Sequence, residues 1–293
     1  MEYWTVINAR EEFSNAWETY AGVALRAHNG PSVLQTDCDT VEKALKKHVG
    51  QVFHPHRMEI SNLQPGEFYP RIHRQAFRST QQEFPLPHIQ FGTEMAASLE
   101  SARTLFVQAR DVFRYVEPCR SNRSVYGDQL RSLLILACTE VESAWRSVLI
   151  SNNGASQNDR LTTQQYVKLL QPMRLNEWEI GLSGFPDYPA QLPFGSWDRS
   201  APTASLAWYD AYNRVKHDRE GSLSWATLEH VLSAVCSVLV MLLAQFSLVP
   251  LRGPNPLSAD FVLISAPSWR LGELYVPELV DWGNGTWRER TFF

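Results

Sequence analysis

Apolar side chains recur at helical spacing through the middle of the chain. Residues 93–116 and 126–150 place them every three to four positions, which predicts two long amphipathic helices. Further helices are predicted at residues 162–170, 205–220 and 223–247. Gly221 is the expected stop signal of the helix at 205–220. Helices this close in sequence are typical of an antiparallel bundle, so the fold is expected to be mainly α.

The last of these helices is apolar on nearly every side. Residues 231–249 contain no charged side chain and approach the roughly 20 residues that a membrane span requires. Ser233, Ser237, Gln245 and Ser247 nevertheless interrupt the apolar surface. A helix buried at the centre of a bundle explains both features, so we expect no membrane contact.

The pattern weakens toward both ends of the chain. Asn8 and Glu11 have the spacing of a helix capping box, and the side chains that follow predict an amphipathic helix over residues 13–24. A second short helix is expected at residues 39–50, whereas residues 51–87 have no clear period. Short strands are expected at residues 67–77, 261–264 and 287–293.

These elements divide the 293-residue chain into three parts. Residues 1–90 form an α+β segment of unknown fold, residues 91–250 the helical bundle, and residues 251–293 a tail. The tail has too little apolar surface to fold alone, so we expect it to pack on the rest of the protein.

Charge narrows the classes of function. A formal net charge of -4 argues against a protein that binds nucleic acid over its whole surface, but it allows a local basic patch. Residues 43–78 are such a stretch, because they contain seven Lys or Arg, only two Asp or Glu, and several aromatic side chains. This mixture suits single-stranded RNA, although an ordinary solvated face has the same composition.

Metal and cofactor signals are weak. The four cysteines are too far apart for a zinc ribbon or a redox motif, and His54 and His56 lack a nearby pair of carboxylates. Glycine-rich phosphate loops and catalytic serine elbows are missing from the sequence. We therefore expect no metal and no cofactor. Because no secretory signal is recognisable, the expected compartment is the cytoplasm.

The residues from Trp208 to Arg219 carry the most informative chemistry. Asn213 and His217 are four positions apart, so they share a helix face with Tyr209 one turn earlier. The neighbouring face carries a ladder of alternating charge, formed by Asp210, Arg214 and Asp218. The negative end of the helix dipole favours a protonated His217, which could donate a proton near neutral pH.

This block resembles the Tyr-Asn-x-x-Lys-His-Asp-Arg form of the HEPN superfamily, and the resemblance extends over residues 91–249. In that family a central helix carries an arginine, a polar residue, three variable positions and a histidine; Asn213 and His217 match the polar residue and the histidine. The resemblance implies a homodimeric RNA- or nucleotide-binding protein of a prokaryotic defence or toxin system. In catalytic members, arginine and histidine side chains of two subunits meet, and a ribose 2'-hydroxyl attacks the adjacent phosphate without a metal.

Tyr212 occupies the position of the family arginine, and here the sequence departs from the family pattern. A tyrosine can hydrogen-bond a phosphate but supplies no fixed positive charge, and stabilisation of developing charge is usually the largest catalytic effect. Candidates for the missing cation and for phosphate binding are Arg214, Lys216 and Arg219. Of these, Arg214 is nearest to the His217 face in helical spacing.

The same residues allow an architectural interpretation. The polar face of the helix would then be tied by hydrogen bonds to Glu140 or Glu142, and the protein would be a non-catalytic helical interaction or scaffold module. Glu142 is also spaced for an ordinary ion pair with Arg146. Glu140 lies beside the apolar stripe of its helix, where a carboxylate needs a partner. A third interpretation is a helical partner of a nucleotidyltransferase.

Overall fold

The computed structural model describes residues 3–8, 13–19, 22–27, 32–44, 47, 55–75, 91–251, 257–281 and 284–293. The described chain is mainly α-helical and divides into two compact units. The N-terminal unit contains Met1–Tyr69, Arg74–Ile89 and Ser268–Arg290. The helical unit contains Pro70–His73, Gln90–Pro267 and Thr291–Phe293. The residues after 250 are therefore shared between the two units.

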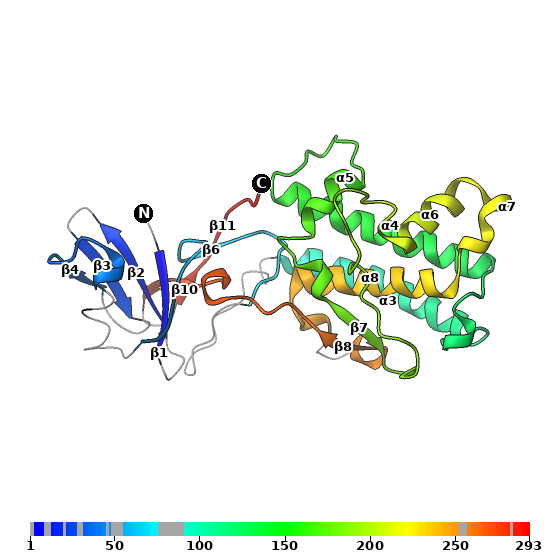
Figure 1. Ribbon diagram of the computed structural model, residues 1–293, viewed down its shortest axis with the longest axis horizontal. Coiled ribbons are helices and arrows are strands. Elements are labelled where there is room, and N and C mark those ends of the chain that lie inside the picture. The colour runs from blue at the N-terminus through cyan, green and yellow to red at the C-terminus, as the bar shows by residue number, and fades with distance from the viewer. Residues whose placement is uncertain are drawn as a thin grey trace. The chain divides into compact units, whose positions relative to one another are not determined.

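A helix that is apolar on nearly every side lies at the centre of the helical unit. This helix, α8 (Leu228–Phe246), confirms the helix predicted at residues 223–247. It packs against three other helices, which are α3 (Gly92–Phe113), α4 (Asp128–Ser151) and α6 (Ala207–His217) (Figure 1). The long helices α3 and α4 confirm the elements predicted at residues 93–116 and 126–150.

Among the described residues, α8 is the one helix that is long and apolar enough to cross a membrane. Its most apolar window has a mean hydropathy of 1.8, and 83% of that window is buried inside the protein. A buried core helix passes the same test of length and composition. Its polar side chain Gln245 is hydrogen-bonded within the unit, because its Nε2 donates to Met241 O and its Oε1 accepts from Arg71 Nε, both at 2.8 Å.

Aromatic rings fill the space between α4 and α6. Trp145 of α4 is fully buried and stacks on Trp197, with ring centroids 4.9 Å apart. Tyr166 of α5 (Thr163–Tyr166) and Tyr209 of α6 lie 5.1 and 5.5 Å from the same indole. Clustered rings of this size contribute much of the apolar area that a core buries. Trp197 belongs to the loop at residues 186–202, so this loop supplies part of the core.

Two short strands also belong to the helical unit. The strands β7 (Glu179–Leu182) and β8 (Phe261–Ser265) pair antiparallel, with Gly181 opposite Val262. A Cβ at Gly181 would lie only 2.8 Å from Val262 Cγ1, so a larger residue at this position would force the Val262 side chain to shift. β8 confirms the strand predicted at residues 261–264.

Single turns of 3-10 helix connect the larger elements. The predicted helix at residues 162–170 is split between α5 and one of these turns. The turns are η3 (Arg120–Asn122), η4 (Val167–Leu169), η5 (Leu175–Glu177), η6 (Leu223–Trp225), η7 (Val249–Leu251), η8 (Leu257–Ala259) and η9 (Leu271–Glu273).

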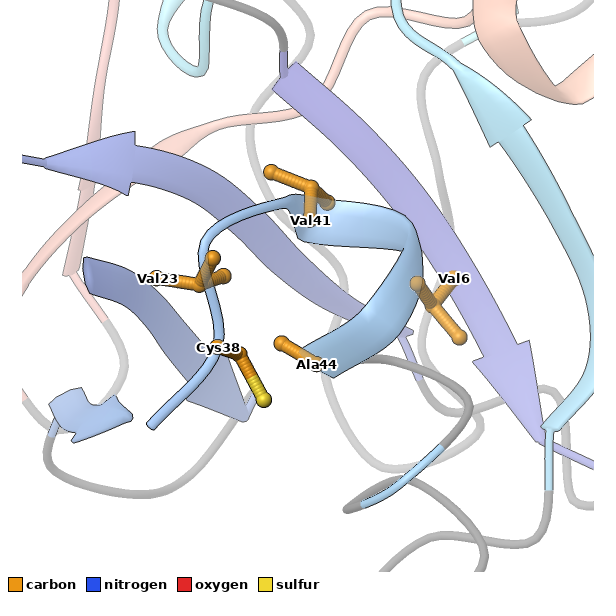
Figure 2. Packing of buried hydrophobic residues seen from close by; sticks show 5 residues of the cluster. All are labelled: Val6, Val23, Cys38, Val41 and Ala44. Atoms are coloured by element: carbon orange, nitrogen blue, oxygen red, sulfur yellow. The ribbon is translucent and has the colours of Figure 1, made fainter. Parts of the chain in front are cut away.

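The N-terminal unit is built on an antiparallel sheet of five strands in the order β4-β3-β2-β1-β5. The strands are β1 (Tyr3–Asn8), β2 (Phe13–Thr19), β3 (Gly22–Ala27), β4 (Ser32–Gln35) and β5 (Pro55–Ile60). The short helix α1 (Val41–Ala44) lies against this sheet and forms a small apolar core with it (Figure 2). That core consists of Val6, Val23, Cys38, Val41 and Ala44.

The amphipathic helix predicted at residues 13–24 is wrong, because the chain forms β2 and β3 there. Trp17 of β2 pairs with Tyr3 of β1 on one side and with Ala24 of β3 on the other. These pairings join consecutive strands of one sheet, and they override the local helical spacing of the aromatic residues. Of the helix predicted at residues 39–50, the structure describes α1; residues 45, 46 and 48–50 lie outside the described residues.

Residues from the end of the chain complete the N-terminal unit. β11 (Arg288–Glu289) pairs in parallel with β6 (Glu67–Phe68), which is the part of the predicted strand at residues 67–77 that the structure contains. The strands β9 (Glu278–Asp281) and β10 (Asn284–Thr286) pair antiparallel. The tail thus contributes strands to the N-terminal unit as well as β8 to the helical unit.

Asn152 fastens two chain segments to the end of α4. It is fully buried, and its Nδ2 donates to Pro70 O at 2.8 Å while its Oδ1 accepts from the Phe292 N–H at 3.3 Å. Its backbone oxygen also accepts from the Phe293 N–H at 3.2 Å. All of these groups belong to the helical unit. One side chain therefore binds the backbone of two segments that are far apart in the sequence.

We expect Asn152→Ala to lower the free energy of unfolding by about 2 kcal/mol, because the carbonyl of the buried residue Pro70 loses its side-chain donor and the Phe292 N–H loses an acceptor. Urea denaturation followed by circular dichroism measures this change. The control is Asn158→Ala, at an exposed position of the following loop, which should stay within ~0.5 kcal/mol of the unsubstituted protein. Equal stabilities of the two variants would contradict the role assigned to Asn152.

Candidate functional site

The helix α6 exposes one end of the motif and buries the other. Tyr209 and Tyr212 are buried, Asn213 is half-buried, and Lys216 and His217 are exposed. The buried residues face α4 and α8, against which α6 packs. The structure therefore gives the predicted site residues of α6 two environments: the two tyrosines are in the core, and Lys216 and His217 are at the surface.

The helix α6 ends at His217, three residues earlier than predicted. Asp218 leaves the helical conformation and caps α7 (Arg219–Ser222), with its Oδ1 accepting from the Gly221 N–H at 2.9 Å. Gly221 is therefore not the stop signal of α6; its missing side chain makes room for the Asp218 carboxylate. The side chain of Arg219 lies outside the described residues.

Tyr209 links α6 to α4 through a short hydrogen bond. Its hydroxyl donates to Glu142 Oε1 at 2.5 Å. Burial, and then this bond, raise the pKa of Tyr209 far above its usual range, so the phenol stays protonated and can serve only as a donor here. The predicted tie between the polar helix face and Glu142 is thus present for Tyr209.

Glu142 and Arg146 do not pair in the described structure, although their spacing suits an ion pair. The Arg146 guanidinium instead donates to the backbone oxygens of Asp159, at 3.0 Å, and Gln157. Backbone carbonyls of a nearby loop have replaced the carboxylate as its acceptors. The predicted Glu142–Arg146 ion pair is wrong for this reason.

The ring of Tyr212 lies in the core, and a lysine binds its hydroxyl. Tyr212 is 1% exposed, and Lys216 Nζ donates to its Oη at 2.8 Å. The same ammonium lies 4.9 Å from the ring centroid. This hydrogen bond raises the pKa of Lys216, so the side chain stays charged. At the position where the resembled motif has arginine, this chain thus has the buried ring of Tyr212, and the exposed ammonium of Lys216 lies one turn later.

Arg214 is held by other groups and does not supply a free cation beside His217. Its Nε donates to Asp210 Oδ2 at 2.8 Å, and its guanidinium carbon lies 4.2 Å from the ring centroid of Trp225. The charge ladder stops there, because the carboxylate of Asp218 caps α7 instead. Of the two candidate cations with described side chains, Lys216 is the one next to Tyr212.

Asn213 and His217 have no side-chain hydrogen bond among the described residues. The polar layer expected from Tyr209, Asn213 and His217 together is therefore confined to Tyr209. Asn213 is half-buried and His217 is exposed at the last position of α6. Both side chains keep their hydrogen-bonding groups for solvent or for a ligand.

Arg131 contributes to the site although the sequence does not indicate it. Its Nε donates to Val215 O at 2.9 Å, so an arginine from the start of α4 satisfies a carbonyl at the end of α6. The two residues are 84 positions apart, and no local pattern connects them. The contact places another positive charge at the negative end of the α6 dipole, on the carbonyl of the residue before Lys216.

Glu140 lies half-buried on α4 without a partner among the described residues. Burial raises the pKa of its carboxyl group, which matches the expectation that a carboxylate beside the apolar stripe is poorly accommodated. Metal clusters are absent from the part of the chain that the structure describes: no three His, Cys, Asp or Glu residues there could hold an ion. His54 lies outside the described residues.

The comparisons with known proteins return nothing. No protein-family model, no curated protein and no solved structure matches the chain.

We expect Glu140→Gln to stabilise the protein at neutral pH, by well under 1 kcal/mol because solvent screens a partly exposed charge. The folded state raises the pKa of Glu140, so this group contributes stability below its unfolded pKa and loses that contribution as pH rises through its folded pKa. The advantage of the variant should therefore vanish near pH 4 and appear by pH 7.

Thermal unfolding of both proteins across this pH range measures the effect. Glu117→Gln is the matched control, because Glu117 is exposed outside a helix. A difference between Glu140→Gln and the unsubstituted protein that is constant with pH would contradict the assignment.

Proposed function

We propose that the helical unit is an antiparallel HEPN-like bundle that binds RNA or a nucleotide at the exposed end of α6. One observation carries this proposal: Lys216 Nζ is hydrogen-bonded to Tyr212 Oη at 2.8 Å. Lys216 therefore brings a positive charge to the residue that replaces the family arginine. Its neighbour His217 is exposed at the same helix end. An ammonium beside an exposed imidazole can hold a phosphate and move a proton.

The activity that we propose for this site is metal-independent cleavage of RNA in a homodimer. A ribose 2'-oxygen attacks the adjacent phosphorus and loses its proton to the His217 imidazole of one copy. The bond from phosphorus to the 5'-oxygen breaks, and the protonated His217 of the other copy supplies the proton that this oxygen needs. Lys216 stabilises the negative charge on the phosphoryl oxygens. The products are a 2',3'-cyclic phosphate and a 5'-hydroxyl.

The biological setting is proposed from the resemblance alone. HEPN-like proteins of this form suggest a prokaryotic defence or toxin system in the cytoplasm.

Asn213 would orient the phosphate in the cleavage reaction, since its amide is half-buried one turn before His217. The stretch at residues 43–78 remains a second proposed RNA-binding surface.

The alternative function is a non-catalytic helical scaffold, and one observation favours it. The Tyr212 ring is 1% exposed and packs in the core, and Arg214 is paired with Asp210 of the same helix, so both have structural roles. In that case the bond between Tyr209 and Glu142 and the lysine on Tyr212 fix the orientation of α6 and have no catalytic role.

We expect the protein to cleave labelled single-stranded RNA in excess EDTA, and His217→Ala to lower the rate about 100-fold or more, because proton transfer is lost. Lys216→Ala should weaken RNA binding and reduce the salt dependence of affinity by about one phosphate contact. Tyr212→Phe should weaken binding less than Lys216→Ala does, since it removes the hydroxyl that positions Lys216 but keeps the ammonium.

Lys168→Ala is the control for Lys216→Ala, because Lys168 is an exposed lysine of η4. Gel analysis of products and filter binding at several salt concentrations measure these effects. Absence of cleavage with intact, Lys216-dependent binding would leave a binding protein. Absence of both would favour the scaffold.

A further inference from the structure

An exposed tryptophan stands next to the candidate site. Trp225, at the end of η6, is 41% exposed, although tryptophan is among the residues that burial favours most on average. The described structure places it against α6 through Arg214, one turn before His217 in that helix. The last turn of α6 therefore has the exposed ring on the side of Arg214, and the exposed side chains of Lys216 and His217 follow within the same turn.

Two contacts hold Trp225 in place, one on its ring and one on its backbone. The Arg214 guanidinium lies 4.2 Å from its ring centroid and is itself fixed by the 2.8 Å bond to Asp210. On the backbone side, Trp225 O lies 2.7 Å from Nδ1 of His230, in the first turn of α8. A ring that is already ordered loses little conformational entropy when a ligand packs on it.

The charge of Arg214 is balanced by Asp210. The two side chains form an ion pair that has no net charge, so the pair attracts a phosphate less than an unpaired arginine would. What the Asp210, Arg214 and Trp225 group offers a ligand is a flat surface. Flat, polarisable groups beside a cation are what an unpaired nucleobase stacks on.

We propose that Trp225, backed by Arg214, is a stacking platform for an unpaired base of the RNA whose phosphate is bound by Lys216. This inference rests on the proposed function and adds the residue by which the site would select unpaired over paired RNA. In a duplex both faces of each base are covered by neighbouring bases, so a paired base cannot lie on the indole. Stacking is also indifferent to which base is present, so the platform selects strandedness and not sequence.

The experiment measures binding of a fluorescein-labelled oligouridylate of about 12 nucleotides, a length within the usual site size of single-strand binding proteins. Fluorescence anisotropy in EDTA gives the affinity at several salt concentrations. A second oligonucleotide lacks the bases at its central positions, and a third probe is an RNA duplex. The variants are Trp225→Leu, Trp225→Phe, Lys216→Ala and, as control, Phe293→Leu.

Phe293 is a matched control because it is also 41% exposed and belongs to the helical unit, where it lies near Gly154 beyond the end of α4. We expect Trp225→Leu to weaken oligouridylate binding about 10-fold, which is ~1.4 kcal/mol and within the range for one stacked base. Trp225→Phe should keep most of the affinity. The salt dependence should change with Lys216→Ala and stay the same with Trp225→Leu.

The abasic oligonucleotide separates stacking from a folding defect. It should bind the unsubstituted protein more weakly than oligouridylate does, but bind Trp225→Leu as well as oligouridylate does. If Trp225→Leu binds oligouridylate like the control while Lys216→Ala is weakened, the stacking platform is overturned and the proposed RNA site stands. If the unsubstituted protein binds none of the probes, both are overturned.

Discussion

One constraint shapes the helical unit: α8 is apolar on nearly every side, so other elements must cover it. α8 exposes almost no side chain, and 83% of its most apolar window is buried. A helix of that kind is stable in water only when other elements surround it. α3, α4 and α6 meet this need, and the polar Gln245 near its end is bonded to Arg71 and to the backbone.

Covering α8 also determines how α6 presents its side chains. Because α6 must pack on both α8 and α4, the apolar parts of Tyr209 and Tyr212 are buried, and their hydroxyls find Glu142 and Lys216. Lys216 and His217 then remain on the solvent side of the helix. The same packing that stabilises the bundle thus separates a hydrogen-bonded anchor from an exposed polar end. A substitution at the anchor would change the position of the exposed groups without touching a ligand.

The residues of the α6 motif therefore differ in what they can do, although they are neighbours in sequence. Arg214 is paired with Asp210 and covers Trp225, so its role is in shaping the surface. Lys216 keeps its charge at the surface beside Tyr212. Arg131 reaches the end of α6 from another helix. Charge at this end of the unit comes from the two helices α4 and α6, and the motif supplies only part of it.

The sequence by itself determined the helices of the bundle, because apolar spacing over twenty or more residues leaves few alternatives. It also determined that the polar residues of α6 share a face and that a carboxylate of α4 would bind there. The predicted N-terminal helix was wrong: residues 13–19 and 22–27 form strands, because pairing between strands overrides the local pattern. Only the tertiary structure decided that Glu142 binds Tyr209 in place of Arg146, that the Tyr212 ring is buried, and that Arg131 reaches Val215. Each of these depends on which groups meet across helices, and hydrogen-bond partners 67 or 84 positions apart leave no periodic signal in the sequence.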